Sequence, residues 1–309
     1  MSASTTFPRQ AIGLLVLMTV FWGVNWPVLK VTLVEIAPLH FRSWCFLAGV
    51  IGLFSIALAS GQSLRVPKGQ WGRLTLIAFL NMTCWNILAV YAIPMMASGR
   101  AAILAYTMPV FGVLFSVWLL GEKLTRRRVV GVLLGMGGML LLFSTEFSSL
   151  QRAPLGAILM ISSAVIWALG VVAMKRWPVD MPLTPNIAWQ MVIGGIPVLL
   201  GAVFVETGSF DLTRLSFWPL FGTVYNMIIA FVFCYWVFAK ITIMAPVGVS
   251  TLSILMTPVV GVFSGVFFLG ETLHWQDMVA LALVLAALAT VMLPPGIGRR
   301  FMRAANDSR

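Results

Sequence analysis

Ten long stretches of hydrophobic residues follow one another along the chain, and short polar segments separate them. Each stretch is close to the roughly 20 residues that an α-helix needs to cross the hydrocarbon core of a bilayer. Because lipid offers no partners for backbone N–H and C=O groups, stretches of this length fold as helices. The pattern therefore predicts an all-α integral membrane protein with ten transmembrane helices, at about residues 11–31, 37–60, 73–95, 98–120, 128–145, 154–175, 183–206, 217–239, 245–269 and 276–294.

The composition of the chain agrees with this prediction. Hydrophobic residues make up 60% of its 309 residues and charged residues only 9%, whereas a soluble domain is about half apolar and about a quarter charged. Arg9 precedes the first stretch, as in a signal peptide, but no small-x-small cleavage site follows the apolar core. We therefore expect a retained first helix after an N-terminal tail at 1–10.

The net charge of +11 is spread unevenly over the predicted loops. If the N-terminus is cytoplasmic, fifteen of the twenty Lys and Arg residues lie on the inner side. The residues left for the outer side are Lys30, Arg42, Arg100, Arg152 and Arg214. The positive-inside rule predicts a multi-pass protein of the bacterial cytoplasmic (inner) membrane with both termini cytoplasmic, the second as a basic tail at 295–309. The basic residues are scattered without interleaved aromatic residues, so we expect the lipid bilayer and no nucleic acid as partner.

Two segments of the chain nearly repeat each other. Residues 107–124 read TMPVFGVLFSVWLLGEKL and residues 256–273 read MTPVVGVFSGVFFLGETL. At this offset of 149, Pro109 corresponds to Pro258, and both segments end shortly after a Gly-Glu pair. Earlier in each half the offset is 145, and it matches Trp22 with Trp167, Lys30 with Lys175 and Asn81 with Asn226.

The repeat divides the chain into two halves of five helices each. The first half covers 11–145 and the second covers 154–294, with a linker at 146–153. Because five is odd, the second half enters the membrane from the opposite side. Inverted halves of this kind are typical of transporters, whose substrate sites lie near the bilayer midplane where the halves meet. We therefore predict two inverted five-helix repeats around a central cavity.

At this point the chain resembles the EamA-type branch of the drug/metabolite transporter superfamily. The resemblance covers about residues 11–294 and rests on three features: five plus five helices, the P-x-x-G-x-x-x-x-x-x-x-x-G-E pattern at 109–122 and 258–271, and the Trp22–Lys30 ending of the first stretch. Within this superfamily, the many tryptophans and methionines make the chain most similar to bacterial aromatic amino acid exporters. The resemblance implies a cavity walled mainly by the helices at 11–31, 73–95, 98–120, 154–175, 217–239 and 245–269.

Polar side chains inside the predicted helices are mostly amides, phenols and indoles. Trp85 and Trp167 lie about halfway along their stretches, where an indole N–H needs a partner, so a protein-lined cavity suits them better than lipid. Since Trp22 and Trp167 are equivalent in the repeat, we expect their rings to face each other across the axis. Asn25 has no such counterpart, because Gly170 occupies the equivalent position. A solute that is not symmetric must be recognised by residues that the two halves do not share. We therefore expect Asn25 to contact the substrate.

None of the nine acidic residues lies at the centre of a predicted helix. A site without net charge can hold a zwitterion, with aromatic rings on its apolar part and amides on its amino or carboxylate group. Small residues such as Ser253 line two stretches, which allows close packing and also leaves room for a solute. We expect Pro109 and Pro258 to act as matched hinges. The predicted substrate-binding residues are Trp22, Asn25, Asn81, Trp85, Tyr106, Trp167, Asn226 and Ser253.

These features predict a secondary transporter that exports small metabolites, aromatic amino acids first, across the cytoplasmic membrane by alternating access. Other amino acids, drug-like solutes and nucleotide sugars are the alternative substrates, and a structural membrane subunit is the alternative outside transport. Proton antiport and facilitated diffusion both stay open. Two histidines and three cysteines without metal-ligand spacing predict no metal site, and we expect neither a cofactor nor enzymatic activity. A monomer is compatible with this mechanism.

Overall fold

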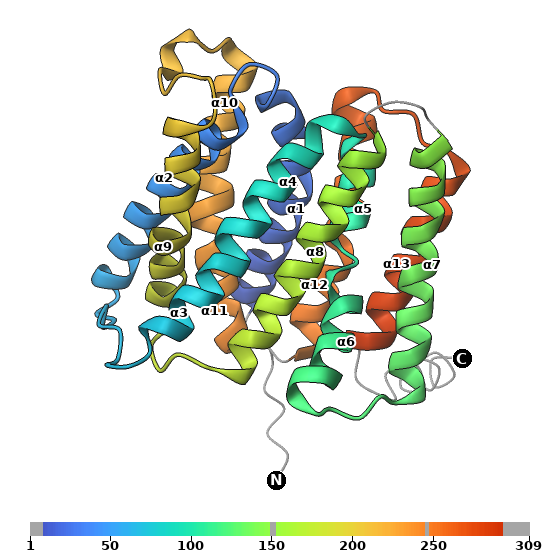
Figure 1. The fold of residues 1–309 in the computed structure, drawn as a ribbon, viewed down its shortest axis with the longest axis horizontal. Coiled ribbons are helices and arrows are strands. Elements are labelled where there is room, and N and C mark those ends of the chain that lie inside the picture. The colour runs from blue at the N-terminus through green and yellow to red at the C-terminus, as the bar shows by residue number, and fades with distance from the viewer. Residues whose placement is uncertain (1–8, 149–152, 245–246, 293–309) are drawn as a thin grey trace.

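The computed structural model describes residues 9–148, 153–244 and 247–292, and all regular elements in these ranges are helices (Figure 1). Side chains are described for 12–142, 155–241 and 256–291. Most of the predicted tails and linker therefore lies outside the described residues.

The first half of the chain contains α1 (Arg9–Thr32), α2 (Pro38–Ala59), α3 (Trp71–Ala78), η1 (Phe79–Cys84), α4 (Trp85–Ala92), η2 (Ile93–Met95), α5 (Ser98–Ala105), α6 (Met108–Leu120) and α7 (Arg126–Ser148). The second half contains α8 (Ala153–Arg176), α9 (Leu183–Phe204), η3 (Leu212–Arg214), α10 (Phe217–Tyr225), η4 (Asn226–Cys234), α11 (Tyr235–Met244), α12 (Val247–Leu269) and α13 (Trp275–Met292).

Seven helical segments among the described residues are long and apolar enough to cross a membrane. They are Ile12–Thr32, Pro38–Ala59, Trp71–Met95, Ser98–Leu120, Leu155–Arg176, Leu183–Phe204 and Phe217–Ile241. Met256–Leu269 and Trp275–Val291 are shorter apolar helices. The chain is therefore a multi-pass membrane protein. The stretch predicted at 128–145 lies within α7, whose side chains are described only as far as residue 142.

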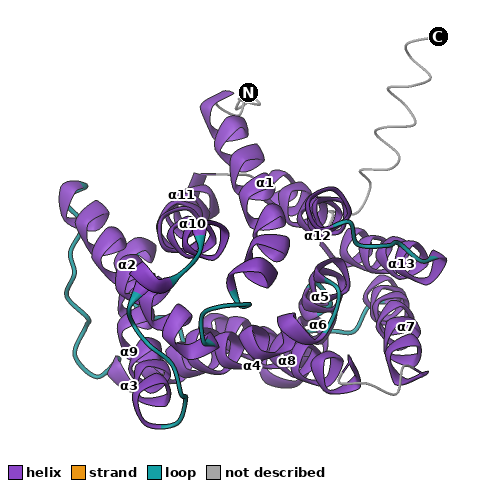
Figure 2. Cartoon of the chain, turned by 90° about the horizontal axis from the view of Figure 1, so that it is seen from above, coloured by secondary structure: helices purple, strands orange, loops and turns teal. Residues whose placement is uncertain are grey.

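Helices at equivalent places in the two halves pack against each other. The second helix of each half, α2 and α9, form one such pair, and α7 and α13 form another. In Figure 2 these pairs lie at opposite ends of an elongated molecule, with α1, α4, α5, α8 and α12 between them. Two more contacts, α1 with α12 and α8 with α6, join the first helix of each half to the fourth segment of the other.

The repeated Gly-Glu pair ends a helix in both halves. Gly121 follows α6 with a φ of 66°, and Gly270 follows α12 with a φ of 64°. This left-handed conformation is the usual end of an α-helix and favours glycine, which lacks a Cβ. The turn reverses the chain directly after the helix. It thereby leaves the next residue, Glu122 or Glu271, beside the end of the bundle.

Candidate functional site

Three asparagines inside the bundle have a side-chain oxygen that no described group satisfies. The Oδ1 atoms of Asn25, Asn81 and Asn226 are buried and lack a hydrogen-bond partner in the described part of the chain. Buried polar atoms are nearly always hydrogen-bonded, and leaving one unpaired costs about 1–3 kcal/mol. All three asparagines are predicted from the sequence as substrate contacts. Each of these oxygens therefore keeps an unused hydrogen-bond acceptor position.

Asn81 and Asn226, which are equivalent in the repeat, both lie in π-helical turns. Asn81 belongs to η1, and Asn226 begins η4 and donates from its amide nitrogen to the carbonyl of Gly222 over 3.0 Å. Turns of this kind are rare and are frequent at functional sites. Gly170 of α8 lies against the Asn81 amide, and a Cβ at that position would overlap it. The close approach of α8 therefore fixes where the Asn81 side chain lies.

The predicted tryptophans form two separate aromatic contacts. The rings of Trp85 on α4 and Trp167 on α8 lie 6.2 Å apart, which joins the two halves of the chain. Trp22 on α1 instead packs edge-on against Tyr235 of α11, with ring centroids 5.7 Å apart, and beside Phe238. Trp22 and Trp167 thus have different ring partners. That they face each other across the axis stays a prediction.

The two predicted hinge prolines lie in different local structures. α5 ends at Ala105 and α6 begins at Met108, so Pro109 lies in the first turn after a break at Tyr106 and Thr107. The side chain of Tyr106 reaches across to hydrogen-bond Thr257 of α12. Pro258, in contrast, lies inside the continuous helix α12. The side chain of Ser253, also in α12, lies outside the described side chains.

Each repeated lysine pairs with the repeated glutamate of the other half. Lys30, at the end of α1, lies 3.1 Å from Glu271, and Lys175, at the end of α8, lies 2.6 Å from Glu122. Figure 1 places the loop after α6 at the end of the bundle nearest the N label and the loop after α12 at the opposite end. The two ion pairs therefore lie at opposite ends of the molecule.

Glu271 also binds the first turn of α5. Its carboxylate accepts hydrogen bonds from the backbone N–H of Ser98 at 2.7 Å, the Ser98 hydroxyl at 2.9 Å and the N–H of Gly99 at 3.2 Å. A carboxylate is well placed there, since the N-terminus of a helix carries free donors and a partial positive charge. Burial alone would raise the pKa of Glu271, but these hydrogen bonds and Lys30 outweigh it and lower the pKa.

The Lys175–Glu122 pair is more exposed. The side chain of Lys175 is 67% exposed, against 32% for Lys30. Glu122 also accepts a hydrogen bond from Arg128 at 2.7 Å, and its pKa is lowered mainly by the hydrogen bond from Lys175. The two repeat-equivalent pairs therefore have different surroundings at the two ends of the same structure.

Two polar groups in the bundle are not predicted by the sequence. Glu206, just after α9, accepts hydrogen bonds from the backbone N–H groups of Leu39 and His40 at the start of α2 and from the hydroxyl of Tyr91. Arg42, assigned from charge counting to the outer side, is buried between helices and is only 5% exposed. The absence of any acidic residue within four positions of Arg42 is the signal that could have marked it.

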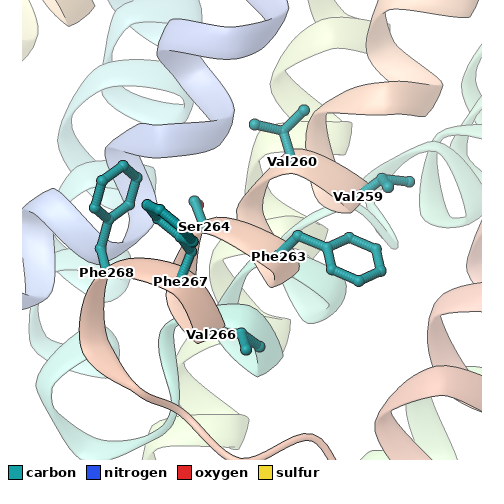
Figure 3. A pocket seen from close by; sticks show the side chains of 7 residues that line it. All are labelled: Val259, Val260, Phe263, Ser264, Val266, Phe267 and Phe268. Atoms are coloured by element: carbon teal, nitrogen blue, oxygen red, sulfur yellow. The ribbon is translucent and has the colours of Figure 1, made fainter.

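A hollow of about 580 Å³ follows one side of α12 (Figure 3). Its lining consists of Val259, Val260, Phe263, Ser264, Val266, Phe267 and Phe268. Phe267 is 82% exposed, and the one hydroxyl, that of Ser264, donates to the carbonyl of Gly261. None of the sequence-predicted site residues lines this hollow. An exposed apolar surface of this kind suits contact with lipid chains better than selection of a polar solute.

Two segments of the chain, residues 9–144 and 154–293, each match the EamA-like transporter family. The chain belongs to this family. Both matches fall on the two halves of the molecule, and together they extend over nearly all of the described helices. This member of the EamA-like transporter family is accordingly a membrane transporter.

Relatives of this EamA-family chain match it over most of its length. An uncharacterized transporter of Bacillus subtilis, YoaV, is 24% identical over 274 residues, which are 88% of this chain and 90% of YoaV. A probable amino-acid metabolite efflux pump of Salmonella typhimurium strain LT2 is 26% identical over 290 residues, 89% of this chain and 92% of the pump. A solved crystal structure superposes with a TM-score of 0.67 at 20% identity over 94% of this chain and 98% of its own. That likeness shows a shared fold.

Proposed function

We propose that this EamA-family protein exports aromatic amino acids across the bacterial cytoplasmic membrane by alternating access. The observation that carries the proposal is the set of buried, unpartnered oxygens on Asn25, Asn81 and Asn226. An ammonium group carries three N–H donors and no acceptor, so it is a suitable partner for such oxygens. The Salmonella relative named as a probable amino-acid metabolite efflux pump supports the same class of substrate.

In the proposed topology, ten helices form two inverted halves of five, with both termini in the cytoplasm. α7 is then the fifth helix of the first half, opposite its counterpart α13. The pairing of α7 with α13 and of α2 with α9 supports this arrangement, because a pseudo-two-fold axis brings equivalent helices together. The bias of Lys and Arg toward one side supports the orientation.

Alternating access requires that one end of the bundle opens while the other closes. We propose that the Lys30–Glu271 and Lys175–Glu122 pairs close the outer and inner ends in turn. Support comes from their unequal surroundings, since Glu271 is 12% exposed and bound to the first turn of α5, whereas Glu122 is 24% exposed. The break before Pro109 and the proline inside α12 are the proposed bending points of the fourth segment in each half.

The proposed binding site combines these amides with aromatic rings. The Trp85–Trp167 pair lies on α4 and α8, and α8 also holds Asn81 in place through Gly170. An aromatic side chain of the substrate would pack on this pair, since aromatic rings favour offset or edge-on contacts with one another. Trp22, Tyr106 and Ser253 complete the proposed site.

The test is flux of radiolabelled phenylalanine, tyrosine and tryptophan in proteoliposomes that contain this chain alone. We expect protein-dependent flux of at least one of them, and a drop of about tenfold or more in Trp167→Ala, since truncation removes the aromatic contact. Trp118→Ala is the matched control, because Trp118 is 73% exposed on the outside of the bundle. Absence of flux for all three amino acids would refute the proposed substrate. It would also agree with the alternative role as a structural subunit.

A further inference from the structure

Arg42 is a buried cation inside a membrane-spanning helix. It is the fifth residue of α2, a segment apolar enough to cross the membrane, and 5% of its surface is exposed. Ionisable side chains are rare at such places because water cannot solvate the charge, and those that occur commonly mark a substrate or ion pathway.

The surroundings of Arg42 are aromatic. Its guanidinium carbon lies 5.2 Å from the ring centroid of Phe41 and 5.5 Å from that of Phe231 in η4. The Cys45 thiol hydrogen-bonds with the guanidinium, and the Tyr235 phenol is the other titratable group that interacts with it. The buried Nε atom has no hydrogen-bond partner, and among the described residues no carboxylate lies within ion-pair distance of Arg42.

These contacts leave the positive charge uncompensated. Cation–π contacts with two phenylalanines recover only part of what a buried guanidinium loses in leaving water. A hydrogen-bonding anion would supply the rest. Since the described part of the chain does not supply one, an anionic group of another molecule is the remaining partner. The planar guanidinium with its five donors matches a carboxylate, which it binds in a bidentate manner.

The position of Arg42 connects it to the proposed site. Tyr235 packs against Phe231 with ring centroids 5.7 Å apart, and on its other side it packs against Trp22 at the same spacing. Arg42 therefore lies at one end of a row of rings whose other end is a predicted substrate residue. The unpaired oxygens of Asn25, Asn81 and Asn226 are acceptors, whereas Arg42 offers only donors.

We propose that Arg42 binds the carboxylate of the transported molecule and thereby makes this transporter selective for carboxylate-bearing aromatic solutes. The inference rests on the proposed function and deepens it: the guanidinium binds the carboxylate, the asparagine oxygens accept from the ammonium group, and the rings contact the side chain. The site as a whole is then complementary to a zwitterion.

The experiment measures ligand binding to the full-length protein purified in detergent. L-phenylalanine carries both charged groups, 3-phenylpropionate lacks the ammonium group, and 2-phenylethylamine lacks the carboxylate. We expect Arg42→Gln to raise the Kd of phenylalanine and 3-phenylpropionate by about 10- to 100-fold, the range of a charge-assisted hydrogen bond. The Kd of 2-phenylethylamine should stay the same. Arg214→Gln, which alters an arginine that is 77% exposed, is the matched control and should bind all three like the wild type.

The melting temperature of the ligand-free protein distinguishes a role of Arg42 in substrate binding from a purely structural role. We expect Arg42→Gln to melt no lower than the wild type, because it removes an uncompensated buried charge. A lower melting temperature together with unchanged Kd values would show a structural arginine and overturn the proposal. If Arg42→Gln does not remain monodisperse, Arg42→Lys takes its place, since it keeps the charge but loses the planar fork.

Three further outcomes would overturn the proposal: unchanged Kd values for both carboxylates, an equal loss for 2-phenylethylamine, or no binding of either carboxylate by the wild type. The proposed function fails in a different way. If the wild type binds the carboxylates through Arg42 but carries no flux of aromatic amino acids in proteoliposomes, then the carboxylate site stands and the export of these amino acids does not.

Discussion

The hydrogen bonds that attach Glu271 to α5 depend on a glycine in the neighbouring turn of α12. A Cβ on Gly265 would lie 2.6 Å from the Glu271 carboxylate and 2.6 Å from the Ser98 hydroxyl. Since non-bonded contacts with carbon are comfortable only at about 3.5 Å, Gly265→Ala must displace one or both groups by most of an ångström. The displaced groups are the two partners of the 2.9 Å hydrogen bond between Ser98 and Glu271.

The expected loss of stability follows from these contacts. A hydrogen bond to a charged group contributes about 1.5–3 kcal/mol, and overpacking costs a further ~1–3 kcal/mol. Alanine is better than glycine inside a helix by up to about 1 kcal/mol, which offsets part of this. We therefore expect Gly265→Ala to destabilise the protein by about 1.5–5 kcal/mol.

The assay is thermal unfolding of the purified protein in detergent. Gly112→Ala in α6 is the matched control, because a Cβ there meets nothing within 4 Å and the melting temperature should stay level or rise. In the Ser98→Ala background one of the two clashes is gone, so Gly265→Ala should cost less than in the wild type. If Gly265→Ala melts like Gly112→Ala, then the carboxylate does not occupy the place described for it.

Three other perturbations test the site and its ends. Asn81→Ala should reduce phenylalanine flux by about tenfold or more while leaving the melting temperature unchanged, because its Oδ1 has no hydrogen bond to lose; normal flux would contradict its role. Lys30→Ala should lower the melting temperature more than Lys175→Ala, since the second lysine is 67% exposed and exposed pairs contribute little; equal shifts would refute this ranking. The pKa of Glu122 lies below its ordinary value of 4.5, chiefly through Lys175, so the stability it contributes should be complete above about pH 4.5 and lost as the pH falls through the lowered pKa. Melting curves of the wild type and Glu122→Gln should therefore differ by a constant amount from pH 7 to pH 5, and a difference that already shrinks in this window would contradict the ion pair.

The positions of the apolar helices could be predicted from the sequence, whereas their internal breaks could not. Hydrophobic length places a helix at 98–120, but the structure divides it at Tyr106 and Thr107 into α5 and α6. The π-helical turns at Asn81 and Asn226 are likewise invisible to a hydrophobicity pattern. Such departures from the α-helix are set by neighbouring helices, which supply the contacts that make an irregular backbone acceptable in a membrane.

The polar residues of the candidate site could be predicted from the sequence more readily than the partners with which charged residues pair. The asparagines could be singled out because amides are uncommon in apolar stretches, and their oxygens prove to be unpartnered. The partners of Lys30 and Lys175 could not be found in this way, because each glutamate lies in the other half of the chain. Arg42 was missed because the charge count assigned it to the outer side, although it lies within the stretch predicted at 37–60. Its burial against Phe231 of η4 is a contact between distant segments that hydropathy does not show.

The exchanged lysine–glutamate pairs have a consequence for how the protein is built. Each half of the chain contains one lysine and one glutamate of the set. The two residues lie at opposite ends of that half, and each has its partner in the other half. Neither half can therefore form these lysine–glutamate pairs by itself. Two halves produced as separate polypeptides should recognise and complement each other, whereas one half alone could close these pairs only by joining a second copy of itself. The two halves of the continuous chain are thus joined by ion pairs in the way that two separate subunits would be.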